Sequence, residues 1–144
     1  MNLEKIQDLW QEDAQIDRTD FISESIKIPH LHHKYFLLLS TERLLYKKLE
    51  SDYKKLKLNK IEFLTMGPTK ETQELGWTLP SKGRVIKAEV SLYLDADQDL
   101  IDLGLRIAMQ EEKVKFLESI LYSLNNRTFQ IKNAIEWFKL TNGG

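Results

Sequence analysis

Three observations predict an all-α fold, a long antiparallel helical hairpin preceded by a short N-terminal helix. In the last third of the chain, positions spaced alternately three and four apart from Leu100 to Phe138 are apolar except for Gln110 and Thr128, which is the seam of a coiled-coil-like helix. A less regular heptad pattern precedes it between Leu31 and Phe63. Glycine and proline are scarce and gather at a few breakpoints, so we expect long elements with short joints. A chain of 144 residues is expected to form one domain.

Residues 1–28 are predicted to form an N-terminal helical segment. A short helix over residues 3–14 has an apolar face made by Leu3, Ile6, Leu9 and Trp10. Residues 17–20 offer capping side chains for a second short segment. Pro29 then marks a boundary, because the residue before a proline avoids the helical region.

A long basic helix is predicted over residues 29–66, since proline is tolerated at a first helical position. Gly67 and Pro68 form a strong stop signal. Residues 67–94 follow as a connector. Apolar and polar residues alternate over residues 85–94, so this segment is either one short strand or merely extended. A strand there would have to pair with its copy in another subunit.

The C-terminal heptad segment is predicted over residues 95–141, and its helix is expected to run from about Gln98 to Leu140. Asp95, Asp97 and Asp99 suit the positive end of a helix, and Asn142 begins a stop signal. The apolar stripe is too long to stay in water, so it must pack on a helix of the same chain, of a second subunit, or of both. The side chains assigned to oligomerisation are Ile107, Val114, Leu117, Leu121, Leu124, Ile131, Ile135 and Phe138.

The net charge of −1 hides a segregation of charge along the chain. Between residues 43 and 60, seven basic side chains are accompanied by only two acidic ones. A lysine stripe along a helix is the electrostatic footprint expected for a phosphate backbone, although a solvated helix face is the simpler alternative. Lysine dominates arginine, which favours contact with phosphates over reading of bases. The candidate DNA-binding residues, including an aromatic side chain that could stack on a base, are Arg43, Lys47, Lys54, Lys55, Lys57, Lys60, Trp77, Lys82 and Arg84.

Several classes of protein find no support in the sequence. There is no cysteine, which fits a reducing cytoplasm. The histidines at residues 30, 32 and 33 and the aspartates at residues 95, 97 and 99 lack the spacing of a metal site. No nucleotide-binding or nucleophile motif is present, and no stretch could span a membrane or serve as a signal peptide. We therefore expect a non-enzymatic protein without cofactor or metal.

Four stretches of the chain resemble the UvsY family of recombination mediators of T4-like bacteriophages, especially its cyanophage-type members. They are residues 28–35 (IPHLHHKY), 52–56 (DYKKL), 93–100 (YLDADQDL) and 125–137 (NNRTFQIKNAIEW), the last being the most specific. The resemblance covers residues 16–143.

This resemblance implies a non-enzymatic, ring-like homo-oligomer, a hexamer or heptamer, in the cytoplasm of the infected bacterial host. It implies non-specific binding to single-stranded DNA and loading of a RecA-like recombinase onto strands coated by single-strand-binding protein, in recombination, repair and recombination-dependent replication. Mapped by the resemblance, DNA contact falls on Lys57 and Lys60, with Lys54 and Lys55 in support. The competing prediction is a structural coiled-coil adaptor or assembly chaperone that does not bind DNA.

Overall fold

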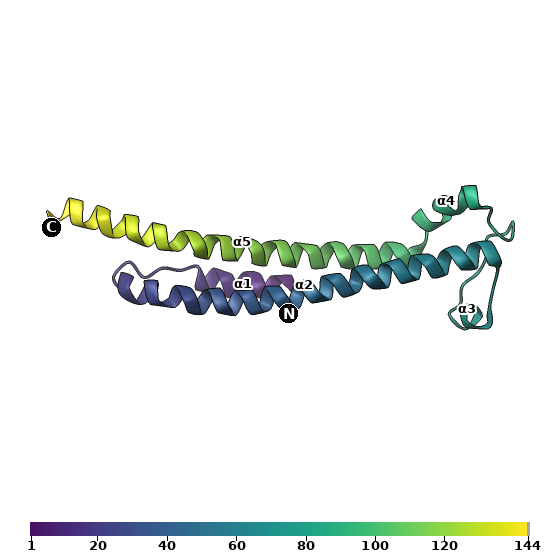
Figure 1. Ribbon diagram of the computed structural model, residues 1–144, viewed down its shortest axis with the longest axis horizontal. Coiled ribbons are helices and arrows are strands. Elements are labelled where there is room, and N and C mark those ends of the chain that lie inside the picture. The colour runs from purple at the N-terminus through teal and green to yellow at the C-terminus, as the bar shows by residue number, and fades with distance from the viewer. Residues whose placement is uncertain (144) are drawn as a thin grey trace. The chain divides into compact units, whose positions relative to one another are not determined.

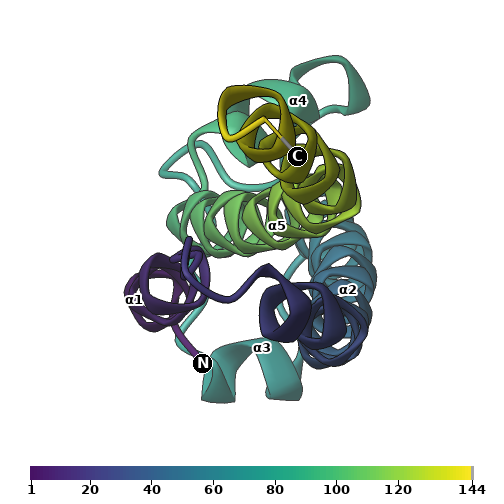
Figure 2. The same cartoon turned by 90° about the vertical axis from the view of Figure 1, so that its left-hand side faces the viewer.

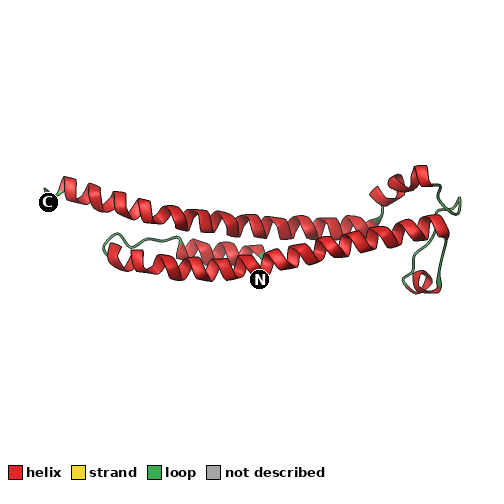
Figure 3. Ribbon diagram, viewed as in Figure 1, coloured by secondary structure: helices red, strands yellow, loops and turns green. Residues whose placement is uncertain are grey.

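Residues 1–143 are described by a computed structural model, in which every element is helical (Figures 1 and 3). No strand occurs in this part of the chain. The elements in chain order are α1 (Leu3–Asp13), α2 (Phe21–Met66), α3 (Lys70–Glu74), the 3₁₀ helix η1 (Lys87–Glu89), α4 (Val90–Asp95) and α5 (Gln98–Thr141). The predicted all-α fold is therefore confirmed.

The chain divides into two compact units. Unit 1 comprises Met1–Leu45 and Gln110–Gly144, and unit 2 comprises Tyr46–Met109. Because α2 and α5 each run through both ranges, each unit contains a part of both long helices. That the whole chain acts as a single domain stays a prediction.

Unit 1 packs α1 against its parts of α2 and α5 (Figure 2). The Asn2 side chain caps α1 by accepting a hydrogen bond from the backbone N–H of Lys5 (2.8 Å), as N-cap residues do. The two long helices run antiparallel in unit 1. Glu42 of α2 is hydrogen-bonded to Gln110 of α5, whereas His32, earlier in α2, borders the same hollow as Asn125, later in α5. The most deeply buried apolar side chains of unit 1 are Ile6, Leu39, Leu117, Ile120 and Leu124.

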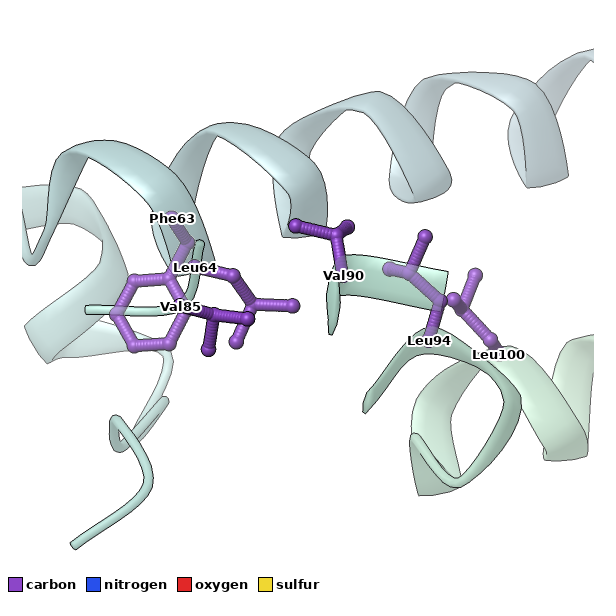
Figure 4. Close-up of a cluster of buried hydrophobic side chains, with 6 residues drawn as sticks. All are labelled: Phe63, Leu64, Val85, Val90, Leu94 and Leu100. Carbon is purple, nitrogen blue, oxygen red and sulfur yellow. The ribbon is translucent and has the colours of Figure 1, made fainter. Parts of the chain in front are cut away.

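Unit 2 has its own apolar core, shown in Figure 4. The backbone N–H of Val85 donates to the carbonyl of Leu64 (2.8 Å) and ties the end of the connector to α2. The cluster joins α2, the connector, α4 and the start of α5 through Phe63, Leu64, Val85, Val90, Leu94 and Leu100. The packing of these segments fixes the surroundings of the basic residues of unit 2.

The predicted start of the long helix at Pro29 is wrong, because α2 already begins at Phe21. The Asp20 carboxylate accepts a hydrogen bond from the Ser23 N–H (3.1 Å) and supplies the cap that starts the helix. Pro29 lies inside α2 and removes one backbone hydrogen bond, to the carbonyl of Ser25. Both residues are exposed, so water can bond that carbonyl. The boundary between residues 28 and 29 is therefore not a break in the helix.

The prediction of a short strand or an extended segment over residues 85–94 is also wrong. The segment forms η1 and α4 instead, and Val90 and Leu94, four residues apart, are both buried. A helix satisfies its backbone hydrogen bonds locally, whereas a lone strand would leave them without partners. As predicted, α5 begins at Gln98, after α4 has ended at Asp95.

Other predicted helix ends are confirmed. The helix α2 ends at Met66, and Gly67 follows with φ of +95°, a conformation that glycine adopts without steric cost. The predicted end of the C-terminal helix at residue 141 matches α5. Within residues 1–143, no helix combines the length and apolar character needed to cross a lipid bilayer.

Candidate nucleic-acid interface

Four lysines of α2 form an exposed set in unit 2, which we call the basic face: Lys47, Lys54, Lys55 and Lys57. Within the described residues, none of the four takes part in an ion pair. An uncompensated lysine keeps its full charge for an outside anion, and its ammonium contacts a phosphate as a point charge. The basic face can therefore bind phosphates without rearranging internal ion pairs.

Two further basic residues of α2 already have acidic partners. The Arg43 guanidinium lies 3.0 Å from a carboxylate oxygen of Glu118 in unit 1, and about half of each side chain is exposed. Lys48 lies 3.4 Å from the Asp52 carboxylate one turn later. Exposed pairs of this kind contribute only about 0–1 kcal/mol, so neither pair prevents contact with a phosphate.

Lys60 differs from the other predicted DNA contacts because it is buried, with a relative exposure of 6%. Its Nζ lies 2.7 Å from Asp99 and 3.1 Å from Asp97. It also lies 4.0 Å from the centroid of the Trp77 ring. Each residue advances by about 100° around a helix, so Lys60 points to the side of α2 roughly opposite Lys47. The sequence could not show that acidic residues occupy that side.

The remaining predicted contacts belong to the connector. Trp77 is half-buried and meets the Phe63 ring edge-on, with 5.6 Å between centroids. Lys82 and Arg84 are exposed. The Arg84 guanidinium lies against Gly67, where an added Cβ would come within 3.0 Å of its Nε. Arg84 therefore places a positive charge beside the C-terminus of α2, where the helix dipole favours one.

The predicted oligomerisation residues fall into three groups by burial. Val114, Leu117, Leu124 and Ile131 are buried within the single chain, Ile107, Leu121 and Ile135 are half-buried, and Phe138 is exposed. The buried ones belong to the core of unit 1, so their apolar character is explained without a second subunit. Large apolar side chains that stay exposed on α5 in unit 1 are Tyr122, Phe129, Trp137, Phe138 and Leu140.

A polar cluster in unit 1 was not foreseen from the sequence. The Asp13 carboxylate accepts hydrogen bonds from Lys34 Nζ (2.6 Å) and the Tyr35 hydroxyl (2.7 Å). Arg127 Nη2 donates to the carbonyl oxygens of Asp13 (3.1 Å) and Ala14 (3.2 Å) at the end of α1. These contacts join α1, α2 and α5, and no spacing rule links residues so far apart in the chain.

The pKa values of this cluster follow from its contacts. Burial alone would raise the pKa of Asp13, but the hydrogen bonds from Lys34 and Tyr35 outweigh it and hold that pKa below its usual value. Burial and the hydrogen bond to Asp13 raise the pKa of the Tyr35 hydroxyl. At neutral pH the cluster therefore contains an ionised carboxylate and a neutral phenol, and it acts as a structural joint.

No group of three or more His, Asp or Glu side chains able to hold a metal ion occurs among residues 1–143. His32 stacks on Phe36 (6.1 Å between centroids) instead of facing the other two histidines. The features available for binding are therefore the basic face, the connector with Trp77, and the exposed apolar residues of α5.

Three solved structures with a similar fold are crystal structures of the bacteriophage T4 recombination mediator protein UvsY. For lattice type II the TM-score is 0.79 at 22% identity, covering 100% of this chain and 99% of that chain. For lattice type IV the TM-score is 0.78 at 18% identity, covering 98% of this chain and 99% of that chain. For lattice type I the TM-score is 0.78 at 19% identity, covering 95% of this chain and 98% of that chain. These similarities show the fold, and a search of curated proteins found no match.

A family model extends the similarity to the sequence itself. The model described as "Recombination, repair and ssDNA binding protein UvsY" matches residues 9–144, which is nearly the whole chain. The match includes all of α2, the connector and α5. The chain therefore belongs to the UvsY family of recombination, repair and single-stranded-DNA-binding proteins.

Proposed function

We propose that this chain is a phage recombination mediator that binds single-stranded DNA without sequence preference through the basic face. The observation that carries the proposal is the set of four exposed lysines of α2 without internal ion pairs. Membership of the UvsY family supports the same conclusion from the sequence side. Lysines contact phosphates without distinguishing bases, which suits a protein that must act on any strand.

The basic face of one chain offers few phosphate contacts, so its binding at physiological salt is weak. A ring of six or seven copies raises the affinity, because each bound face increases the effective concentration of the next. We propose that the exposed apolar residues of α5 make the contacts between copies. A hollow of 850 Å³ in unit 1, bordered by Ile16, Phe21, Trp137 and Phe138, can accept apolar side chains of a second copy.

The mediator acts between two other proteins in this proposal. A strand held on the basic faces is a poorer substrate for the single-strand-binding protein and an entry point for a RecA-like recombinase. The acidic segments over residues 4–20 and 95–102 are the proposed docking surfaces for these partners, and the protein acts in the cytoplasm of the infected host. It needs no cofactor and catalyses no reaction, so its whole effect comes from binding.

The test replaces three lysines of the basic face, Lys54, Lys55 and Lys57, with alanine. Fluorescence anisotropy of a labelled mixed-sequence single strand, titrated at several salt concentrations, gives the affinity and its salt dependence. We expect weaker binding and a slope of log K against log salt reduced by about 2, because each phosphate contact to a single strand contributes about 0.7.

A matched control removes the same charge elsewhere, by replacing the exposed Lys5, Lys115 and Lys132 with alanine. This variant should keep both the affinity and the slope of the unchanged protein. Equal losses in the two variants would mean that only net charge matters, and the basic face would not be the site. A folded oligomer without affinity at low salt would favour the structural adaptor instead.

A further inference from the structure

Lys60 lies where three segments of unit 2 meet. Its ammonium bridges Asp97 (3.1 Å) and Asp99 (2.7 Å) around the start of α5. The same ammonium lies over the ring of Trp77 in the connector, 4.0 Å from its centroid. The side chain of Lys60 thus holds the connector and α5 to α2 with a single charge.

A role in direct phosphate contact conflicts with these surroundings. Lys60 is 6% exposed, and two carboxylates within ion-pair distance outnumber its one positive charge. To reach a phosphate, the Lys60 ammonium would have to leave both carboxylates. Breaking a buried ion pair in this way is costly, because it leaves a charge without its partner. Lys57, one turn earlier on α2, is exposed and lacks an ion pair among the described residues.

Trp77 is the aromatic side chain that Lys60 fixes. It is half-buried, and it borders three hollows of unit 2, with volumes of 490, 230 and 440 Å³. The ammonium covers part of the indole, and Phe63 meets the ring edge-on. A cation on the ring and an aromatic at its side hold the indole in one orientation, while the adjoining hollows leave room for a flat group.

We propose that Lys60 is a positioning residue for DNA binding, which holds Trp77 ready to stack on an unpaired base of a strand whose phosphate contacts Lys57, the residue of the basic face one turn earlier on α2. The inference rests on the proposed function, because it assigns a second component to the same binding event. Stacking on an aromatic ring is tolerant of base identity, so this component fits binding without sequence preference.

The test compares Lys60→Met with Lys57→Ala in the anisotropy titration. Methionine keeps the apolar stem of Lys60 and removes its charge. We expect Lys60→Met to weaken binding about tenfold, within the range that one stacked base contributes, with an unchanged salt slope. Lys57→Ala should lower the slope by about 0.7, as the loss of one phosphate contact does. A lowered slope in Lys60→Met would show a direct phosphate contact and overturn the proposal.

A double variant separates positioning from a general structural role. If Lys60 acts through Trp77, the combination of Lys60→Met and Trp77→Ala should bind no more weakly than Trp77→Ala alone. An additional loss in the double variant would mean that Lys60 supports DNA binding by another route. Lys60→Arg should keep the affinity that Lys60→Met loses, because arginine can also pair with both carboxylates and lie over the Trp77 ring. Failure of this rescue would count against the proposal.

A spectroscopic measurement observes Trp77 directly. A background with Trp10→Phe and Trp137→Phe, whose assembled mass and DNA affinity are first checked against the unchanged protein, leaves Trp77 as the remaining tryptophan. Stacking on a base should quench its fluorescence when single-stranded DNA is added. Lys60→Met should reduce that quenching at saturating DNA, whereas Lys57→Ala should not. DNA binding without any quenching would overturn the role of Trp77 and Lys60 while leaving the proposed function intact. Absence of binding by the unchanged protein would instead refute the proposed function itself.

Discussion

Asp13 shows how a single side chain can join three helices of unit 1. It ends α1, accepts hydrogen bonds from Lys34 and Tyr35 of α2, and offers its backbone carbonyl to Arg127 of α5. Buried polar groups are stable only when their hydrogen bonds are made. The stability of α1 in its place should therefore depend on the charge of Asp13.

We predict that Asp13→Asn lowers the free energy of unfolding by about 2 kcal/mol at neutral pH, since hydrogen bonds to a charged group are lost. The pKa of Asp13 in the folded chain lies below its value in the unfolded chain. Its contribution is therefore complete above about pH 4 and is lost as the pH falls through the folded pKa. Urea titrations between pH 2 and 7 should show a weaker acid dependence in Asp13→Asn.

Asp8→Asn is the matched control for this prediction, because Asp8 is an exposed residue of the same helix. It should leave the acid dependence of stability unchanged. If Asp13→Asn and the unchanged protein lost stability equally on acidification, the pH dependence would arise from other carboxylates.

At the scale of elements, the end of α2 depends on one glycine. Gly67 has φ of +95°, and an added Cβ would come within 3.0 Å of Arg84 Nε. Gly104, inside α5, has no neighbouring atom within 4 Å of the position of an added Cβ. The two glycines therefore differ both in backbone conformation and in the space around them.

We predict opposite effects of alanine at these two positions. Gly67→Ala should destabilise the protein by about 1–2 kcal/mol, because alanine is strained at positive φ and crowds Arg84. Gly104→Ala should stabilise it by about 0.5–1 kcal/mol, since alanine favours a helix over the unfolded chain. Thermal unfolding followed by circular dichroism measures both, and a stabilised Gly67→Ala would mean that this turn is not required to end α2.

At the scale of the whole molecule, the heptad stripe of α5 serves the monomer before it serves any assembly. Leu117 and Leu124 are fully buried in the core of unit 1, where they accompany residues of α1 and α2. Trp137 and Phe138 are 66% and 62% exposed, and large exposed apolar patches mark interaction sites. Contacts between copies should therefore depend on Trp137 and Phe138, whereas folding should depend on Leu117 and Leu124.

We predict that replacing Trp137 and Phe138 with alanine reduces the assembled mass while the helical content and the melting temperature of the dissociated chain are retained. Light scattering coupled to size-exclusion chromatography measures this. Leu117→Ala is the contrasting variant, expected to cost about 3 kcal/mol of folding stability through the cavity it leaves. An unchanged mass in the Trp137 and Phe138 variant would exclude these residues from the interface.

The helical class, the first helix, the stop at Gly67 and the end of α5 could be predicted from the amino-acid sequence, because these features depend on local periodicity and on backbone conformation. The sequence also located the exposed lysines of the basic face, since opposite charges are rare nearby in the chain. The prediction that the long helix starts at Pro29 was wrong because a proline signals a break in the local sequence. Packing and the Asp20 cap instead extend α2 back to Phe21.

Which side of each helix is covered follows from the folded structure and not from the sequence. The structure placed Lys60 between Asp97 and Asp99 and against the ring of Trp77, and it buried Leu117 within a single chain. It also showed η1 and α4 where the sequence had left a strand or an extended segment as alternatives. Charge and apolarity are properties of each residue in the sequence, whereas desolvation and ion pairing depend on neighbours that only folding brings within contact distance.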